Sequence, residues 1–185
     1  MNLTDRQQKL LEFVRDKHGT QVRKYTGEPY VNHVISVARI ASEHIEGAIE
    51  IALCHDLFED TDCTFTTLYK QMLSIGYGRD ESYDICRCVT ELSDEFTHET
   101  YPYYNRGKRK QLEAERLGRI QPLSQSVKYA DLIDNTSSIV AHDKGFARVY
   151  LKEKLRILDQ MRGGNINLLV KCCFTLQTAL NEIEK

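Results

Sequence analysis

Two histidines and two aspartates in this sequence are of the residue types that together bind a catalytic divalent metal. His33 comes first, His55 and Asp56 are adjacent, and Asp131 follows far downstream. They offer two imidazole nitrogens and two carboxylates, a donor set suited to a hydrolytic divalent metal. Each lies in an apolar stretch with helical spacing, and buried charge is costly unless it is paired or metal-bound. The four residues therefore predict a metal site.

Two more acids follow the His55-Asp56 pair. Asp60 lies four residues after Asp56, which places both on one face of a helix, and Glu59 lies four residues after His55. A solvated helix end is the alternative explanation. Acids at the C-terminal end of the apolar helix expected over 48–58 would oppose the helix dipole, and this mismatch favours a functional role.

His33 and Asp131 are weak indicators when each is taken alone. A single histidine near a helix start is more often structural or exposed. Asp131 interrupts an apolar stripe, where a lone carboxylate is expensive, and Asn135 lies one turn further on the same face. The order and context of the four residues together favour the metal site over a purely structural role.

The elements that must position these residues are all predicted to be helices. Glycine and proline indicate a loop over 18–29, and residues 93–104 look irregular. Strand-like alternation does not persist anywhere. The sequence therefore predicts one all-α domain over 1–185, a helix bundle with its core at about 10–160. Besides a helix after Thr4, the predicted helices cover 31–44, 48–58, 64–75, 81–92, 106–117, 123–140, 146–161 and a C-terminal helix over 165–183.

The composition narrows the class of protein only slightly. The chain has 185 residues and a formal net charge of −2, which gives no signal for nucleic acid or an anionic membrane. An apolar run of membrane-spanning length is absent, and the first residues are not a signal peptide. The six cysteines form no Cys-x-x-Cys pair, and we interpret them as reduced thiols rather than disulfides. A cytoplasmic protein is therefore expected; its oligomeric state is left open.

The strongest cluster of positive charge is a second candidate feature. Its members are Arg106, Lys108, Arg109, Lys110, Arg116 and Arg119. One explanation is a solvated helix face balanced by Glu113 and Glu115. The other is that one or two of the bases bind phosphate, preferably as a bidentate arginine. Three tyrosines just before the cluster, at 101, 103 and 104, would suit either a base pocket or a cap on the core.

Three stretches of the chain resemble the HD-domain phosphohydrolases, and within them the alarmone hydrolase domain of RelA/SpoT-type enzymes and their small stand-alone relatives. The His-Asp pair alone is typical of the whole superfamily, whereas the flanking residues are far more specific. The resemblance covers about residues 10–158. The matching stretches are Gly27-Glu28-Pro29-Tyr30-Val31-Asn32-His33, Ala52-Leu53-Cys54-His55-Asp56-Leu57-Phe58-Glu59-Asp60-Thr61-Asp62 and Val127-Lys128-Tyr129-Ala130-Asp131-Leu132-Ile133-Asp134-Asn135.

The resemblance implies a role for most of these residues. The metal would be one Mn²⁺ per chain, bound by His33, His55, Asp56 and Asp131. Glu59 and Asp60 match the carboxylate pair that orients or deprotonates the attacking water. Asn135 matches a nucleoside contact, and either Arg23 or Lys24 occupies the place of an arginine that stacks on the base or contacts phosphate. Arg106 and Arg109 are the candidates for binding the pyrophosphate.

The implied reaction is hydrolysis of the 3′-pyrophosphate of ppGpp or pppGpp to GDP or GTP and pyrophosphate. Residues 93–125 match the family least, and in such domains this part shapes the pocket. Two alternatives therefore stay open: an HD phosphohydrolase of another nucleotide, such as an adenosine alarmone, a dNMP or NADPH, and a non-catalytic nucleotide-binding module. Loss of Glu59 or Asp60 would mark the second alternative, and both are present. A nucleic-acid partner is not expected.

Overall fold

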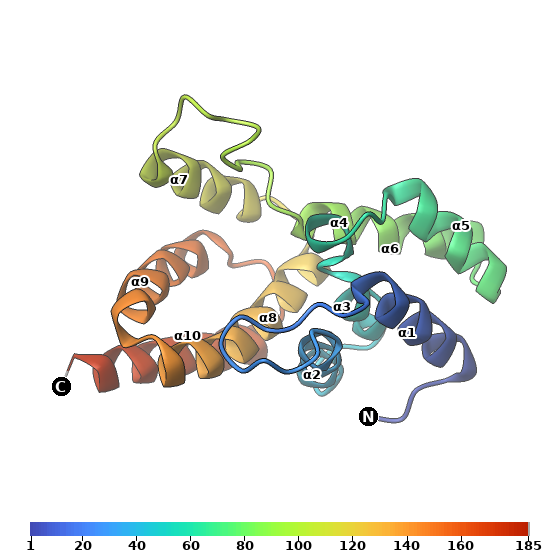
Figure 1. Cartoon of the computed structure of the whole chain (residues 1–185), viewed down its shortest axis with the longest axis horizontal. Helices are drawn as coiled ribbons and strands as arrows, with labels where there is room; N and C mark the ends of the chain where they lie inside the picture. Colours follow the sequence, from blue (N-terminus) through green and yellow to red (C-terminus); the bar gives the residue numbers. More distant parts are fainter. Residues whose placement is uncertain (185) are drawn as a thin grey trace. The chain divides into compact units, whose positions relative to one another are not determined.

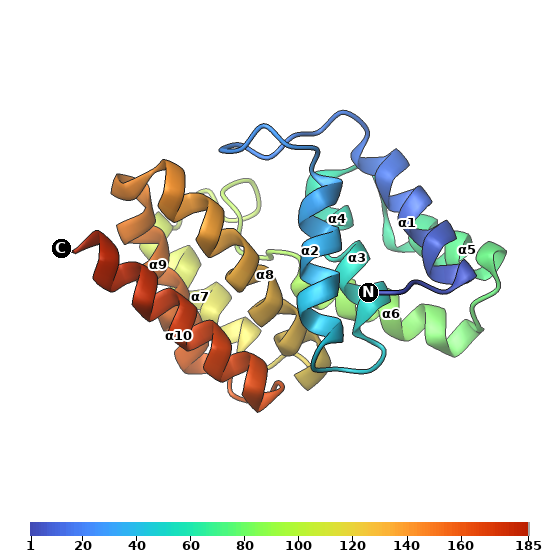
Figure 2. The same ribbon diagram turned by 90° about the horizontal axis from the view of Figure 1, so that it is seen from below.

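The computed structural model describes residues 1–184, and its regular elements are helices (Figures 1 and 2). Within these residues the extended pairing is a single isolated bridge between Val22 and Pro29. The all-α prediction is therefore confirmed. The chain divides into two compact units, residues 1–93 and the residues from 94 on. The expectation of one domain stays a prediction.

Unit 1 packs its helices around a core of aliphatic side chains. Helix α2 lies against α3, α5 lies against α6, and α1 contacts α3, α4 and α5. Thr4 and Thr64 cap the helices that follow them, each accepting a hydrogen bond from a backbone N–H three residues on. The helices of unit 1 are α1 (Asp5–His18), α2 (Val31–Ser42), α3 (Ala48–Cys54), α4 (Leu57–Asp60), α5 (Phe65–Ile75) and α6 (Arg79–Leu92).

The continuous helix predicted over 48–58 is wrong. Helix α3 ends at Cys54, and α4 begins at Leu57 after a break at His55 and Asp56. The backbone of Asp56 has φ −99° and ψ 0°, and its carbonyl accepts the N–H of Asp60 at 2.9 Å. The acids Glu59 and Asp60 therefore belong to the first turn of a new short helix, not to the C-terminal end of a long one. Apolar side chains continue through the break, so their spacing alone could not reveal it.

Unit 2 is built on the long helix α8. Helix α10 packs on α8 and α9, and α9 also contacts α7 and α8. The predicted C-terminal helix thus packs within its own unit. Leu132, Leu151 and Leu176 are among the fully buried side chains of this unit. Its helices are α7 (Arg106–Leu117), α8 (Pro122–His142), α9 (Lys144–Gln160) and α10 (Ile166–Ile183).

The segment before α7 is fixed by a buried acid. Glu113 is only 1% exposed, and its carboxylate accepts the backbone N–H groups of Glu95 and Phe96, both at 3.1 Å. Arg116 pairs with the same carboxylate. Glu113 is therefore not part of a solvated face. Tyr103 is 98% exposed, so this tyrosine does not cap the core of unit 2.

Within residues 1–184, helices long and apolar enough to cross a membrane are absent. All six cysteines are free thiols, and Cys173 alone among them is partly exposed.

Candidate functional site

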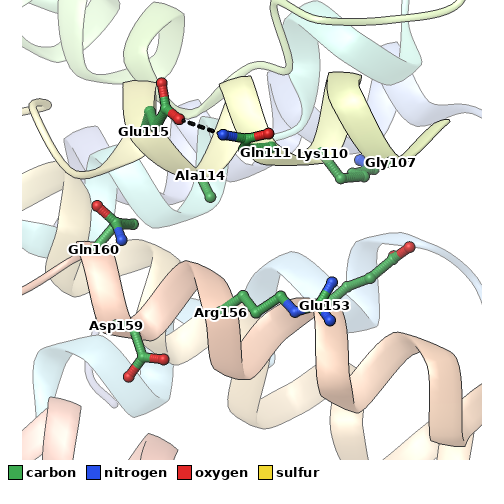
Figure 3. A pocket seen from close by; sticks show the side chains of 9 residues that line it. All are labelled: Gly107, Lys110, Gln111, Ala114, Glu115, Glu153, Arg156, Asp159 and Gln160. Carbon is green, nitrogen blue, oxygen red and sulfur yellow. Dashed lines mark hydrogen bonds between the residues drawn. The ribbon is translucent and has the colours of Figure 1, made fainter. Parts of the chain in front are cut away.

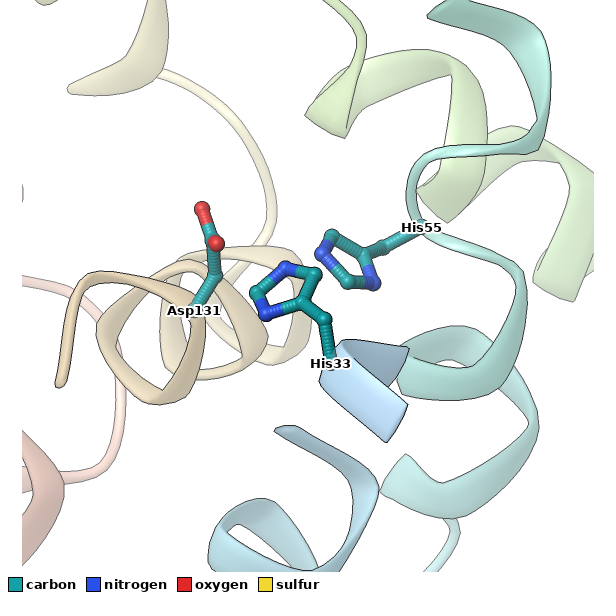
Figure 4. Close-up of side chains that lie close together, drawn as sticks. All are labelled: His33, His55 and Asp131. Atoms are coloured by element: carbon teal, nitrogen blue, oxygen red, sulfur yellow. The ribbon is translucent and has the colours of Figure 1, made fainter. Parts of the chain in front are cut away.

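The candidate centre of unit 1 consists of two histidines that face one carboxylate. Nε2 of His33 lies 3.4 Å from Oδ2 of Asp56, and Nε2 of His55 lies 3.1 Å from the same oxygen. Both histidines are 1% exposed, and Asp56 is 9% exposed. The two rings meet edge to face with centroids 5.2 Å apart, and Figure 4 shows them next to each other. The sequence predicted this convergence, and the turn between α3 and α4 makes it possible.

A backbone contact orients His55. Its Nδ1 lies 2.7 Å from the carbonyl oxygen of Ala52, one turn earlier in α3. A carbonyl only accepts, so Nδ1 is the nitrogen that donates to Ala52, and Nε2 is the nitrogen that faces Asp56. Metal-binding histidines commonly have their second nitrogen held in this way. The donor set of His33, His55 and Asp56 therefore fits a divalent metal.

Tyr30 is a residue of this centre to which the sequence pattern assigned no role. Its hydroxyl donates to Oδ2 of Asp56 at 2.7 Å. The ring stacks on His18 at 4.9 Å between centroids and meets His33 edge-on at 5.4 Å. Burial raises the pKa of Tyr30, and the negative charge of Asp56 raises it further, so the hydroxyl stays a neutral donor. The only signal in the sequence was its place in the motif three residues before His33.

The two predicted catalytic acids lie at the solvent-facing side of the centre. Glu59 and Asp60 are both exposed. Asp60 accepts a hydrogen bond from Nε2 of Gln21 at 3.3 Å, and its charge also contributes to the raised pKa of Tyr30. The structure thus brings Asp60 close to the tyrosine that holds Asp56. Glu59 stays on the same short helix, where its carboxylate is open to water.

Arg23 and Lys24 stand in a tight turn between α1 and α2. The backbone N–H of Arg23 donates to Glu28 at 2.8 Å, and the N–H of Gly27 donates back to Arg23 at 3.0 Å. Gly27 has φ +70°, a left-handed conformation that glycine adopts without strain. Arg23 is half-buried, whereas Lys24 is exposed and lies over the ring of Tyr25.

Asp131, also drawn in Figure 4, belongs to α8 of unit 2 and has partners on its own helix. Nζ of Lys128 lies 2.9 Å from one carboxylate oxygen, and Nδ2 of Asn135 donates to the other at 2.6 Å. Asp131 is 4% exposed. The expected shared face of Asp131 and Asn135 is confirmed. The burial of Asp131 is satisfied by an ion pair, so that burial by itself does not require a metal.

The arginines predicted to bind pyrophosphate have partners in unit 2. Arg106 makes two hydrogen bonds to the carboxylate of Glu153, at 3.0 and 2.8 Å, which link α7 to α9. Arg109 donates to the backbone carbonyl of Tyr104. Both guanidinium groups therefore have acceptors within unit 2.

Metal-dependent hydrolases use buried histidines that face an aspartate, and this all-helical fold contains such a donor set. Comparison with known proteins specifies the class further. The chain is 32% identical over 171 residues to the guanosine-3′,5′-bis(diphosphate) 3′-pyrophosphohydrolase MESH1 of Drosophila melanogaster, covering 87% of each protein. It is 37% identical over 130 residues to MESH1 of Homo sapiens, covering 67% of this chain and 64% of the human protein.

A solved structure gives the same relation. The structure of a metazoan ortholog of SpoT that hydrolyzes ppGpp matches with a TM-score of 0.75 at 27% identity, covering 99% of this chain and 96% of that one. The comparison with models of protein families gives no match. The chain belongs to the MESH1 family of guanosine-3′,5′-bis(diphosphate) 3′-pyrophosphohydrolases.

Proposed function

We propose that this protein is a Mn²⁺-dependent hydrolase that removes the 3′-pyrophosphate from ppGpp or pppGpp, giving GDP or GTP and pyrophosphate. The observation that carries the proposal is the convergence of His33, His55 and Asp56 in a chain that matches a pyrophosphohydrolase over most of both lengths. The reaction consumes one water: the bond between the ribose 3′-oxygen and the diphosphate breaks, the water oxygen bonds to the phosphorus, and a proton goes to the 3′-oxygen.

The metal would be held by His33, His55, Asp56 and, from unit 2, Asp131. Mixed imidazole and carboxylate donors suit Mn²⁺, and in unit 1 the carboxylate of Asp56 lies 3.4 Å from Nε2 of His33 and 3.1 Å from Nε2 of His55. When bound, such a metal lowers the pKa of water and polarises phosphoryl oxygens. The contact of His55 Nδ1 with Ala52 supports this role, because Nε2 is then the nitrogen that faces Asp56.

The remaining residues would orient the attacking water and the substrate and would accept the proton. Glu59 and Asp60, exposed beside the centre, would position the attacking water and take its proton. Arg23 or Lys24, in the turn before α2, and Asn135 would contact the nucleoside. Arg106 and Arg109 stay predicted phosphate contacts. A small-molecule nucleotide is the proposed partner, and the free thiols agree with a cytoplasmic location.

The test is hydrolysis of ppGpp by the purified protein with Mn²⁺ and after chelation, with pyrophosphate and orthophosphate measured separately. We expect metal-dependent release of GDP and pyrophosphate in equal amounts. Absence of turnover on ppGpp, together with turnover of an adenosine alarmone, a dNMP or NADPH, would assign the site to another nucleotide. Metal binding without turnover of any nucleotide would make the protein a binding module.

A further inference from the structure

The end of helix α1 contacts the segment that carries the two proposed catalytic acids. Gln21, in the loop that follows α1, donates from Nε2 to Oδ2 of Asp60 at 3.3 Å. Lys17, in the last turn of α1, pairs with Asp62 at 2.9 Å. These contacts join residues that lie 39 and 45 positions apart in the sequence. The fold of unit 1 therefore places a glutamine amide on the carboxylate of Asp60.

Gln21 is held at its backbone as well as at its side chain. Its N–H donates to the carbonyl of His18 at 2.9 Å, and its carbonyl accepts the N–H of Tyr30, also at 2.9 Å. Its side-chain oxygen Oε1 lies 2.8 Å from Nδ1 of His18. The residue thus contacts the last residue of α1, the tyrosine that holds Asp56, and the acid Asp60. A side chain fixed in this way presents its amide to Asp60 in one arrangement.

The partners of Gln21 determine which way its amide points. The carboxylate of Asp60 only accepts, so the amide nitrogen is the atom that faces it. The amide oxygen then faces His18, and Nδ1 of His18 is the nitrogen that donates to it. The contacts form one chain from the imidazole through the amide to the carboxylate. His18 therefore orients Gln21, and Gln21 orients Asp60.

His18 occupies a place that stability alone does not explain. The residue is 5% exposed, and within the part of the chain that the structure describes its Nε2 has no hydrogen-bond partner. Burial of an unsatisfied polar nitrogen costs free energy, whereas an apolar side chain of similar size would fill the space without that cost. The ring also stacks on Tyr30, with centroids 4.9 Å apart. The contacts with Gln21 and Tyr30 explain this histidine better than the stability of α1 does.

A glutamine of unit 2 with a similar contact shows the difference. Gln111 on α7 donates to Glu115 at 3.0 Å, beside a cavity of about 440 Å³ that is lined by residues of α7 and α9 (Figure 3). The two residues lie four positions apart on one helix, where such contacts add a little to helix stability. The contact of Gln21 instead joins the loop after α1 to α4. Its effect is therefore expected in the position of Asp60 rather than in the stability of a helix.

We propose that Gln21 is a positioning residue of the reaction, which holds the carboxylate of Asp60 in the orientation that acts on the attacking water. The assignment deepens the proposed function and rests on it for the role of Asp60. An exposed carboxylate on a four-residue helix rotates freely, and a hydrogen bond from a fixed amide restricts it. The amide is uncharged, so it orients Asp60 without pairing its charge, as a lysine or an arginine would.

The test compares kcat and KM for ppGpp in the full-length protein with Mn²⁺. Gln21→Met keeps the length of the side chain but removes both of its hydrogen bonds. We expect kcat to fall about tenfold, the loss of one hydrogen bond to a charged group, with KM and Mn²⁺ content unchanged. Lys17→Gln, which shortens the other contact between α1 and this segment, should keep the wild-type kcat. Circular dichroism melts establish that each variant is folded.

A second variant separates the positioning of Asp60 from the support of His18. Gln21→Glu keeps an oxygen that accepts from His18 but replaces the amide donor by an oxygen that repels the carboxylate of Asp60. Positioning predicts that kcat falls at least as far as in Gln21→Met, whereas support of His18 alone predicts a value near the wild type. Gln111→Glu brings two carboxylates together on α7 in the same way and, as the matched control, should keep the wild-type kcat.

A double-mutant cycle measures whether Gln21 acts through Asp60. In an Asp60→Ala background, Gln21→Met should cost much less than tenfold in kcat, because the carboxylate that Gln21 holds is gone. The same fold-loss in both backgrounds would show that the two residues act independently and would overturn the positioning role.

The outcomes separate this proposal from the proposed function. Wild-type kcat in folded Gln21→Met, or an equal fall in Lys17→Gln, would overturn the positioning role even if ppGpp is hydrolysed. If another nucleotide is turned over in place of ppGpp, a fall in kcat of Gln21→Met on that nucleotide would support the positioning role and reject only the substrate. A wild type that turns over no nucleotide would reject both proposals, because there would be no reaction for Asp60 to assist.

Discussion

In unit 1 the ionisable side chains of the candidate centre are short, buried and held by hydrogen bonds. In unit 2 long basic side chains reach carboxylates of neighbouring segments, and both partners are partly open to water. His55 is fixed by a carbonyl 2.7 Å away, and Asp56 by the hydroxyl of Tyr30 at 2.7 Å. Lys110 instead reaches Asp94 at 3.0 Å, and Lys152 reaches Glu184 at 3.4 Å.

The difference reflects two roles. A metal ion requires donor atoms in fixed places, and a preorganised set of rings and carboxylates supplies them. Exposed ion pairs between long side chains tolerate more than one geometry, and each contributes modestly to stability. Substitutions in unit 1 should therefore have larger effects on catalysis than those in unit 2.

The largest effect is expected at Asp56, whose carboxylate both histidines face. Asp56→Asn removes the anionic oxygen that both imidazole nitrogens face, and with it one donor of the proposed metal site. We expect loss of bound metal and a fall in turnover of about a thousandfold or more. Metal content by mass spectrometry and hydrolysis of ppGpp check this. Retention of one metal per chain would show that Asp56 is not a ligand.

The next effect is expected at Glu59. Glu59→Gln preserves the shape of the exposed side chain but removes its capacity to accept a proton. Metal content should stay at the wild-type level, while turnover falls about 10²- to 10⁴-fold. Glu46→Gln, an exposed acid outside the site, is the matched control. Turnover of Glu59→Gln at the wild-type rate would refute the role given to Glu59.

Tyr30 tests whether preorganisation itself matters in unit 1. Tyr30→Phe deletes only the hydroxyl that donates to Asp56. Loss of such a supporting contact should lower metal affinity or turnover about 10- to 100-fold. Tyr83→Phe removes the same atom from an exposed side chain on α6 and should change neither quantity. Equal behaviour of the two variants would mean that Asp56 is held by other contacts.

In unit 2 the expected effect of a substitution is on stability rather than on turnover. Glu113→Gln weakens the carboxylate that accepts two backbone N–H groups and pairs with Arg116. We expect a loss of about 2 kcal/mol in the free energy of unfolding of this unit. Glu115→Gln, on the same helix and bonded only to Gln111, should cost much less. Urea unfolding of both variants measures the difference; similar midpoints would contradict the anchoring role.

The smallest expected effect is a pH-dependent contribution of Asp94 to the stability of the fold. Burial alone would raise the pKa of this carboxyl, but the charges of Lys128 and Lys110 outweigh burial. Its pKa lies below the ordinary value of 3.8, so the folded carboxyl binds a proton less readily than the unfolded one. Its contribution to stability is therefore complete above that value and is lost as the pH falls through the folded-state pKa. Asp94→Asn should destabilise the protein at about pH 7 and match the wild type near pH 2. An equal difference in urea midpoint at both pH values would contradict this.

The sequence predicted the helical class and most helix positions because apolar side chains at helical spacing report directly on which face is buried. The boundaries of α7 agree with the prediction to the residue. The break between α3 and α4 was missed, because His55 and Asp56 interrupt the backbone without interrupting the apolar pattern. Tyr30 was missed for a related reason: its partner Asp56 is distant in the sequence, and nothing local reveals the bond.

By itself, the sequence determined which metal donors and acids the chain contains and in what order. The order of His33, His55, Asp56 and Asp131, and the motifs around them, are fixed by residue type and spacing, which tertiary structure cannot alter. Only the tertiary structure decided which charges meet: that Glu113 is buried and anchors a segment, and that Lys110 pairs with Asp94. The reason is physical, since pairing and burial depend on distances between elements that no local pattern encodes.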